Sequence, residues 1–332
     1  MAIGQLLSAV GRVRRWVLLT GDRHHVTAVL LVLGYVLVAP IGHALLPHGP
    51  HLGGQDATVP LLNTMLSGTF LIFSIVVSIN SLFVSGEQSP LDQQFGRVQS
   101  VVQFRRQLED VIDVEHVPAA PGPLVRTLSG EILARAQRLE DELATTDIDA
   151  RENVSAYVDD LAAETGRMNG ELDGASSPLS VTIAMMNYDH DRQINDLRRL
   201  RAEHADALSS DADEAIDELL RLLQYFAAAR QYFKTLYTKS EFASLSRWLV
   251  LTSVPAVAVA ATFLHYLAWA PESHLLVAGI EAISFTPFLL VASYILRVTT
   301  VSRQTWAAGQ FAVTDASQGA IEGIEREWPG DE

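Results

Sequence analysis

The chain has 332 residues, of which 48% are hydrophobic, and a formal net charge of −15 at pH 7. It contains no cysteine, which excludes disulfides, thiolate metal sites and cysteine nucleophiles. Its 24 basic residues are outnumbered by 39 acidic ones, so we expect no nucleic-acid partner, because such binding needs clustered positive charge. Lys234 and Lys239 are the only lysines, a composition typical of salt-accumulating halophiles or of a GC-rich genome.

Four long apolar runs predict four membrane-spanning helices. Each run has about 21 to 25 residues, enough to cross a hydrocarbon core of roughly 30 Å as a helix. Lipid offers no partner for free backbone groups, so the runs must be helical. The first run is too long for a signal-peptide core, and we expect it to stay in the protein. The runs are Val26–Leu46, Pro60–Val84, Trp248–Trp269 and Leu275–Val298.

The placement of arginines predicts the orientation of these spans. The N-terminal segment, which we expect to lie on the inner leaflet as an amphipathic helix or to be a frayed terminus, carries four arginines. The loops 47–59 and 270–274 carry no basic residue. Basic residues favour the cytoplasmic side, so we expect both termini and the central insertion to be cytoplasmic, in a multi-pass protein of the inner cell membrane.

The predicted fold is an all-α integral membrane protein with four transmembrane helices and a cytoplasmic helical bundle inserted between the second and third. Residues 86–247 have a net charge of −12 and helical periodicity throughout. The expected parts are an N-terminal amphipathic segment (1–25), a first transmembrane hairpin (26–85), an acidic cytoplasmic helical domain (86–246), a second hairpin (247–299) and a cytoplasmic tail (300–332).

Within the insertion, five helices are expected. The first follows the cap-like pair Ser89-Pro90 and ends at a proline cluster, and the next three cover Leu124–Leu143, Asp149–Leu172 and Leu179–Leu208. The fifth begins at Ser210, whose hydroxyl can cap it, and it should run unbroken into the third span. The second span should likewise continue into the first helix. The residues that the first helix places on one face are Val98, Val101, Val102, Arg105, Leu108 and Ile112.

The second span carries a polar stripe that falls within about 60° of the helix circumference, counting 100° per residue. One interpretation is a hydroxyl-lined path for ions or water at the centre of an oligomer. The other is a close helix–helix seam, since small residues allow backbones to approach. The stripe consists of Asn63, Ser67, Ser74, Ser78, Ser81 and Ser85.

Glu281 is an ionisable residue inside the fourth span, about six residues from its outer end. With Phe285 and Phe288 on the same face, it resembles a cation-attracting group above a hydrophobic constriction. The alternative is a carboxylate that reaches the outer interface or bonds to a neighbouring helix. Pro255 and Pro287 interrupt the last two spans and are candidates for gating hinges or static bends.

Other polar clusters carry weaker signals. Five histidines map to the outer side, as weak metal or pH-sensing candidates without ligand spacing on a rigid element: His43, His48, His51, His265 and His274. We interpret Asp189-His190-Asp191 as a solvated face. We expect no metal site, no cofactor and no enzymatic activity, because the phosphate-loop, zinc-protease, nucleophile-elbow and dinucleotide motifs are all missing.

The order of two spans, a large helical insertion and two further spans resembles the MotA/TolQ/ExbB proton-channel family. The glycine- and threonine-rich patterns of that family's last spans are missing here, and no site residue carries over. The leading hypothesis is a homo-oligomeric ion channel or ion-coupled membrane protein, embedded in the lipid bilayer and regulated by its cytoplasmic domain. The alternative is a non-conducting scaffold or signalling protein whose helical domain recruits a soluble protein partner.

Overall fold

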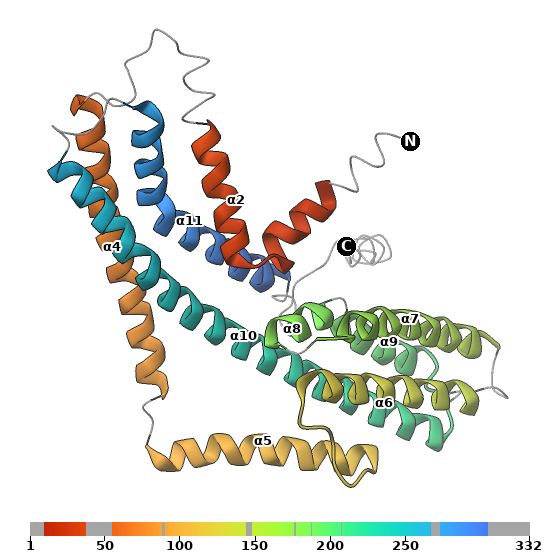
Figure 1. Cartoon of the computed structure of the whole chain (residues 1–332). Helices are drawn as coiled ribbons and strands as arrows, with labels where there is room; N and C mark the ends of the chain where they lie inside the picture. Colours follow the sequence, from red (N-terminus) through yellow and green to blue (C-terminus); the bar gives the residue numbers. More distant parts are fainter. Residues whose placement is uncertain are drawn as a thin grey trace, which may run out of the picture. The chain divides into compact units, whose positions relative to one another are not determined.

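The computed structural model describes residues 10–37, 55–87, 90–143, 148–175, 177–186, 188–206, 208–266 and 273–304. All regular structure in these ranges is helical, which confirms the all-α class. The elements, shown in Figure 1, are η1 (Trp16–Thr20), α2 (Arg23–Val36), α4 (Gln55–Glu87), α5 (Leu91–Ile112), α6 (Pro121–Glu142), α7 (Ile148–Leu172), α8 (Pro178–Met186), α9 (His190–Glu203), α10 (Ser210–His265) and α11 (His274–Gln304).

Three of the described helices are long and apolar enough to cross a membrane. They are α4, with a span over Thr58–Ser81, α10, and α11, with a span over Leu275–Arg303. The sequence predicts four such helices, and the described ranges contain three. The remaining expected span, the first apolar run Val26–Leu46, begins in α2, whose 14 residues extend about 21 Å at 1.5 Å per residue, and the end of this run lies outside the described residues.

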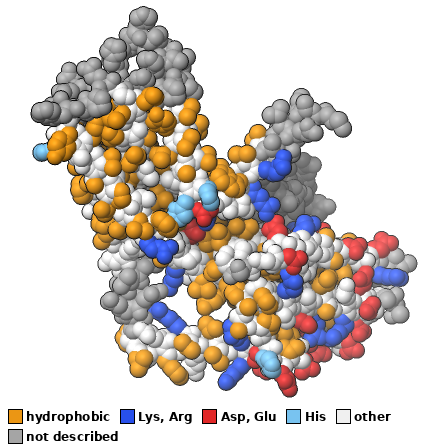
Figure 2. All heavy atoms as spheres, in the orientation of Figure 1, with side chains coloured by type: hydrophobic (Ala, Val, Ile, Leu, Met, Phe, Trp, Pro, Cys, Tyr) orange, Lys and Arg blue, Asp and Glu red, His pale blue; other side chains and the backbone are white. Residues whose placement is uncertain are grey.

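The chain divides into two compact units. Unit 1 comprises Met1–Phe104 and Phe233–Val301, and unit 2 comprises Arg105–Tyr232 and Ser302–Glu332. In unit 1, the core runs between α4, α10 and α11 in two clusters. One gathers around Val76, Leu249 and Leu290, and the other gathers around Leu62 and Ala260. Hydrophobic side chains also cover the outside of these helices (Figure 2), as expected of helices surrounded by lipid.

Unit 2 has a separate core built by α6, α7, α8, α9 and the first part of α10. The apolar side chains of α6 recur every three or four residues, so they form one buried face. Helix α7 packs against α6, the first part of α10 contributes further buried apolar residues to this unit, and the acidic side chains of the unit gather on its surface (Figure 2). Side chains with no exposed surface in this core include Leu128, Ile132, Leu139, Leu161, Leu219, Leu223 and Phe226.

Helix α10 confirms the predicted rod. It runs for 56 residues from Ser210 to His265 and contributes residues to both units. The amide of Ala212 is capped by the hydroxyl of Ser209 at 3.1 Å, so the predicted cap at Ser210 is wrong by one residue. Prolines inside α10 and α11 do not end either helix.

Two predicted continuities are wrong. Helix α4 ends at Glu87 and α5 begins at Leu91, because Pro90 cannot continue a helix by donating a backbone hydrogen bond. The single helix expected over Leu179–Leu208 is two helices, α8 and α9. The second starts afresh because the Asp189 carboxylate accepts a hydrogen bond from the amide of Arg192 at 3.2 Å, which is an N-cap.

Candidate ion site and buried charge cluster in unit 1

The polar stripe on α4 faces away from the other described helices of unit 1. Its members Asn63, Ser67, Ser74, Ser78 and Ser81 are all exposed, and the side chain of Ser85 lies outside the described residues. The hydroxyl of Ser78 donates to the carbonyl of Ser74 at 2.9 Å, which lowers the cost of exposing it to lipid. Among the described residues, nothing covers the stripe, and it lines no path within one chain.

Glu281 lies on the inward face of α11. Its exposed fraction is 9%, and its neighbours one turn away, Val277 and Ser284, are buried as well. The Ser284 hydroxyl donates to the carbonyl of Ile280 at 2.7 Å, so it is occupied by the backbone of its own helix. Among the described residues, the Glu281 carboxylate has no hydrogen-bonding or ion-pairing partner.

Phe285 and Phe288 stack on each other below Glu281. Their ring centroids are 5.2 Å apart and the rings are inclined by 15°. Phe288 packs against α4 at Gly68, where a Cβ atom would come within 2.5 Å of the ring, while Phe285 is exposed on the outer surface of the described unit. The stacked pair therefore extends from the α4–α11 contact to the exposed surface of α11, within two helical turns of Glu281.

The two hinge candidates occupy different surroundings. Pro255 lies on the exposed side of α10, and Pro287 is buried within the core-facing side of α11. Each proline leaves one backbone carbonyl of its helix without the usual donor. Near the first of them, the buried hydroxyl of Ser253 has no hydrogen-bond partner in the described residues.

A buried charge cluster joins α10 and α11. The Arg297 guanidinium donates to the Glu241 carboxylate at 3.0 Å, with only 7% and 11% of the two side chains exposed. Arg297 also donates to the carbonyl of Gly21. The second carboxylate oxygen of Glu241, the Nε of Arg297 and the hydroxyl of Tyr237 are buried without a partner among the described residues.

Arg23, at the start of α2, adds a second buried cation to the cluster. It is 3% exposed, and it donates to the carbonyls of Gly21 at 2.6 Å, Val17 at 2.9 Å and Ser293 at 3.0 Å. Thr27 lies within 3.2 Å of the Ser293 hydroxyl, so α2 is held to α11 twice. The cluster contains two guanidinium groups and one carboxylate, and it ties the N-terminal segment to α11.

In the sequence, the arginines that flank the apolar runs serve only as markers of orientation. The available signal was Glu241, a carboxylate seven residues before the apolar run of α10, near the level of arginines that flank other runs. An acidic residue at that position needs a partner when it is buried. Sequence alone could not choose between the several arginines that flank the spans.

The outer histidines form no described metal site. Within the described ranges, no group of three or more His, Cys, Asp or Glu side chains is placed to hold an ion. His265 is exposed and its ring lies 4.9 Å from that of Tyr266. His43, His48 and His51, and the side chain of His274, lie outside the described residues.

In unit 2, the interpretation of Asp189-His190-Asp191 as a solvated face is wrong for its histidine. His190 is 1% exposed, and its Nδ1 lies 2.9 Å from the Arg230 guanidinium, which is also buried. Burial and the neighbouring Arg230 lower the pKa of His190. Because the break between α8 and α9 turns this residue inward, the helical periodicity of one long helix could not predict its burial.

Comparisons with known proteins identify the family of the chain. The model of a family of unknown function, DUF7972, matches residues 7–323, so the chain belongs to this family. No curated protein and no solved structure matches the chain significantly.

Proposed function

We propose that this member of the DUF7972 family is a homo-oligomeric, ion-coupled membrane protein, either a channel or a transporter, in which Glu281 exchanges the ion. The observation that carries the proposal is that Glu281, only 9% exposed, lies on the core-facing side of a helix long and apolar enough to span a membrane, without a polar partner in the described chain. A carboxylate in such a place is costly, and a bound proton or cation offsets that cost. Neither this function nor its alternative below is enzymatic.

The exposed polar stripe of α4 supports the oligomeric part of the proposal. Polar side chains that face lipid are unfavourable, whereas small polar residues are common where membrane helices pair. A second copy that covers Asn63 and the serines would remove this cost. The stripe would then lie at an interface between copies, where it serves as a seam or borders a polar path.

Helix α10 supports regulation by the domain outside the membrane. It is a single helix that carries Phe226 in the core of unit 2 and Glu241 in the charge cluster of unit 1. A change at one end of a continuous helix shifts the other end, so a partner bound to unit 2 would act on the cluster. With the predicted orientation, unit 2 and both termini are cytoplasmic.

The test is ion flux through the full chain in sealed lipid vesicles. We expect the protein to dissipate a proton or potassium gradient, and Glu281→Gln to slow this flux at least about tenfold, the effect of a 1.4 kcal/mol change in a barrier. Glu152→Gln removes an exposed carboxylate of unit 2 and is the matched control, with unchanged flux. Equal flux in both variants would exclude Glu281 from the ion path.

The oligomer has a separate test, because the chain contains no cysteine. A single Ser78→Cys substitution should form disulfide-linked dimers in the membrane under mild oxidation. Ile75→Cys lies about 60° farther round the same helix, is 50% exposed, and should crosslink much less. Equal crosslinking at the two positions would argue against an ordered seam at the stripe.

The alternative function is a non-conducting scaffold that recruits a soluble protein through unit 2. The observation that favours it is the independent, fully buried core of that unit beneath an acidic surface. Vesicles that stay tight to protons and potassium with wild-type protein, together with a soluble partner retained by the full chain, would favour the scaffold over the ion-coupled protein.

A further inference from the structure

The first three turns of α5 carry a row of exposed apolar side chains. Leu91 is 81% exposed, Phe95 67%, Val98 63% and Val102 42%. Val98 and Val102 share a face of the helix with Leu108 and Ile112, but of these four only Leu108 and Ile112, near the end of the helix, are buried. The apolar start of α5 is therefore left uncovered in the described chain.

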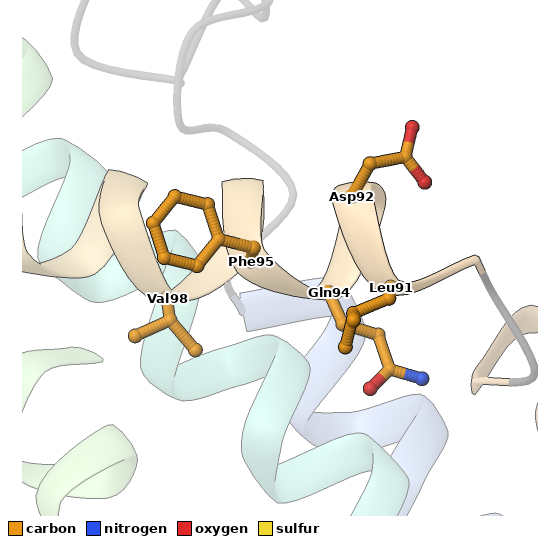
Figure 3. A pocket seen from close by; sticks show the side chains of 5 residues that line it. All are labelled: Leu91, Asp92, Gln94, Phe95 and Val98. Atoms are coloured by element: carbon orange, nitrogen blue, oxygen red, sulfur yellow. The ribbon is translucent and has the colours of Figure 1, made fainter.

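These four residues form one continuous stripe. At 100° per residue they fall within about 60° of the helix circumference. Figure 3 shows a shallow hollow along this surface, with Asp92 pointing to one side of the helix and Leu91 and Val98 to the other. The described residues that line the hollow all belong to α5 itself.

The exposure of the stripe matches that of side chains on the membrane helices. On α4, Phe70 is 62% and Leu71 is 63% exposed, as expected of residues that face lipid. In unit 2, by contrast, the described large hydrophobic residues that are exposed are Val114 and Tyr232, which are far apart in the sequence and form no stripe. A continuous apolar stripe of this kind would be unfavourable if it faced water.

The position of α5 in the chain places it beside the bilayer. It starts four residues after α4 ends at Glu87, a distance that an extended chain covers in at most about 14 Å. The membrane span of α4 reaches Ser81, so only about two further helical turns separate the span from that end. The break at Pro90 frees α5 to take a direction different from that of α4.

The charge of this helix also suits a lipid surface. From Leu91 to Arg106 it carries three arginines and a single acidic residue, Asp92, within an insertion whose net charge is strongly negative. Basic residues on an amphipathic helix are attracted to anionic lipid headgroups, and an apolar stripe about 60° wide inserts beneath them.

We propose that the first part of α5 lies in the membrane interface, with the Leu91–Val102 stripe inserted among the acyl chains on the membrane face where α4 ends. The partner of this surface is the bilayer itself. The inference requires α4 to span the membrane but does not require the protein to conduct ions. In this arrangement α5 anchors the start of the inserted domain to the lipid surface.

Single spin labels on the full chain test this proposal, because the native chain has no cysteine to remove. Val98→Cys and Val102→Cys place labels on the stripe, while Gln93→Cys and Ser100→Cys place exposed labels on the opposite side of α5. Leu71→Cys on α4 is the reference for a lipid-facing site. In vesicles of phosphatidylcholine and phosphatidylglycerol, the collision rate of each label is measured with oxygen, which enters lipid, and with a water-soluble nickel chelate.

We expect the stripe labels to collide more with oxygen than with the nickel chelate, as the Leu71 label does, and the two opposite labels to show the reverse. If all four α5 labels collide mainly with the nickel chelate, the stripe faces water and the proposal is wrong. If the stripe labels are shielded from both reagents, the stripe is covered by protein, either a second copy or another part of the chain, and the proposal is also wrong. Ion flux is measured separately, so a failed flux assay leaves this result intact.

Discussion

The buried pair between Arg297 and Glu241 gives the sharpest prediction about the stability of unit 1. Glu241→Gln preserves the shape of the side chain, and the glutamine oxygen can still accept from the guanidinium at about the same position. The negative charge, however, is lost. Two buried guanidinium groups, those of Arg23 and Arg297, are then left without a nearby carboxylate.

The magnitude follows from the burial of the pair. Removing one partner of a buried ion pair costs about 3–5 kcal/mol, because the remaining charge stays desolvated. Glutamine keeps one hydrogen bond to Arg297, so we expect a loss at the lower end, about 3 kcal/mol of unfolding free energy. The carbonyl of Gly21 keeps its bonds from Arg23 in this variant, so the N-terminal segment remains attached.

The measurement is reversible unfolding of the full chain in mixed detergent micelles, followed by circular dichroism as dodecyl sulfate is added. Asp173→Asn is the matched control. It removes the exposed ion pair with Arg126, whose side chains are 73% and 48% exposed, and should cost no more than about 1 kcal/mol. The double variant Glu241→Leu with Arg297→Met removes both charges and should recover most of the loss.

A cost for Glu241→Gln no larger than that for Asp173→Asn would refute the reasoning, because it would mean that water or lipid headgroups screen the pair. A double variant as unstable as the single one would refute it in another way. That result would show that Arg297 stabilises the unit mainly through its bond to Gly21 and not through the carboxylate.

Two further predictions concern close packing and pH. Gly68→Ala places a methyl group against the Phe288 ring and should cost about 1–3 kcal/mol in the same unfolding assay; Phe288→Leu should relieve most of this cost, and Gly34→Ala, which meets open space, should show none. Because the pKa of His190 is lowered in the folded protein, the unfolded state binds more protons than the folded state below the unfolded pKa of about 6.5. The contribution of His190 to the unfolding free energy is therefore fully present above that pH and falls by up to about 1.4 kcal/mol per pH unit below it. His190→Gln should flatten this pH dependence of the unfolding free energy between pH 7.5 and 5.5. A substitution of the exposed His116 is the control and should keep the full slope.

The helices that follow from local sequence were predicted well. The apolar runs, the all-α class and the unbroken α10 depend on hydropathy and on the absence of helix breakers, which are properties of neighbouring residues. The boundaries at Pro90 and Asp189 were predicted less well. Each depends on whether a short polar segment caps a new helix or continues the old one, and the energies of these two outcomes differ little.

The charged and apolar surfaces depended on contacts between distant parts of the chain. Arg297 meets Glu241 across 56 residues, and Arg23 meets the backbone of Ser293 across 270. The pattern of hydropathy and charge along the sequence by itself determined that the chain has helices long and apolar enough to cross a membrane, with an acidic segment between them. Only the tertiary structure decided which arginines are buried, and that the start of α5 is uncovered, because burial is set by what packs against a residue and not by its neighbours in sequence.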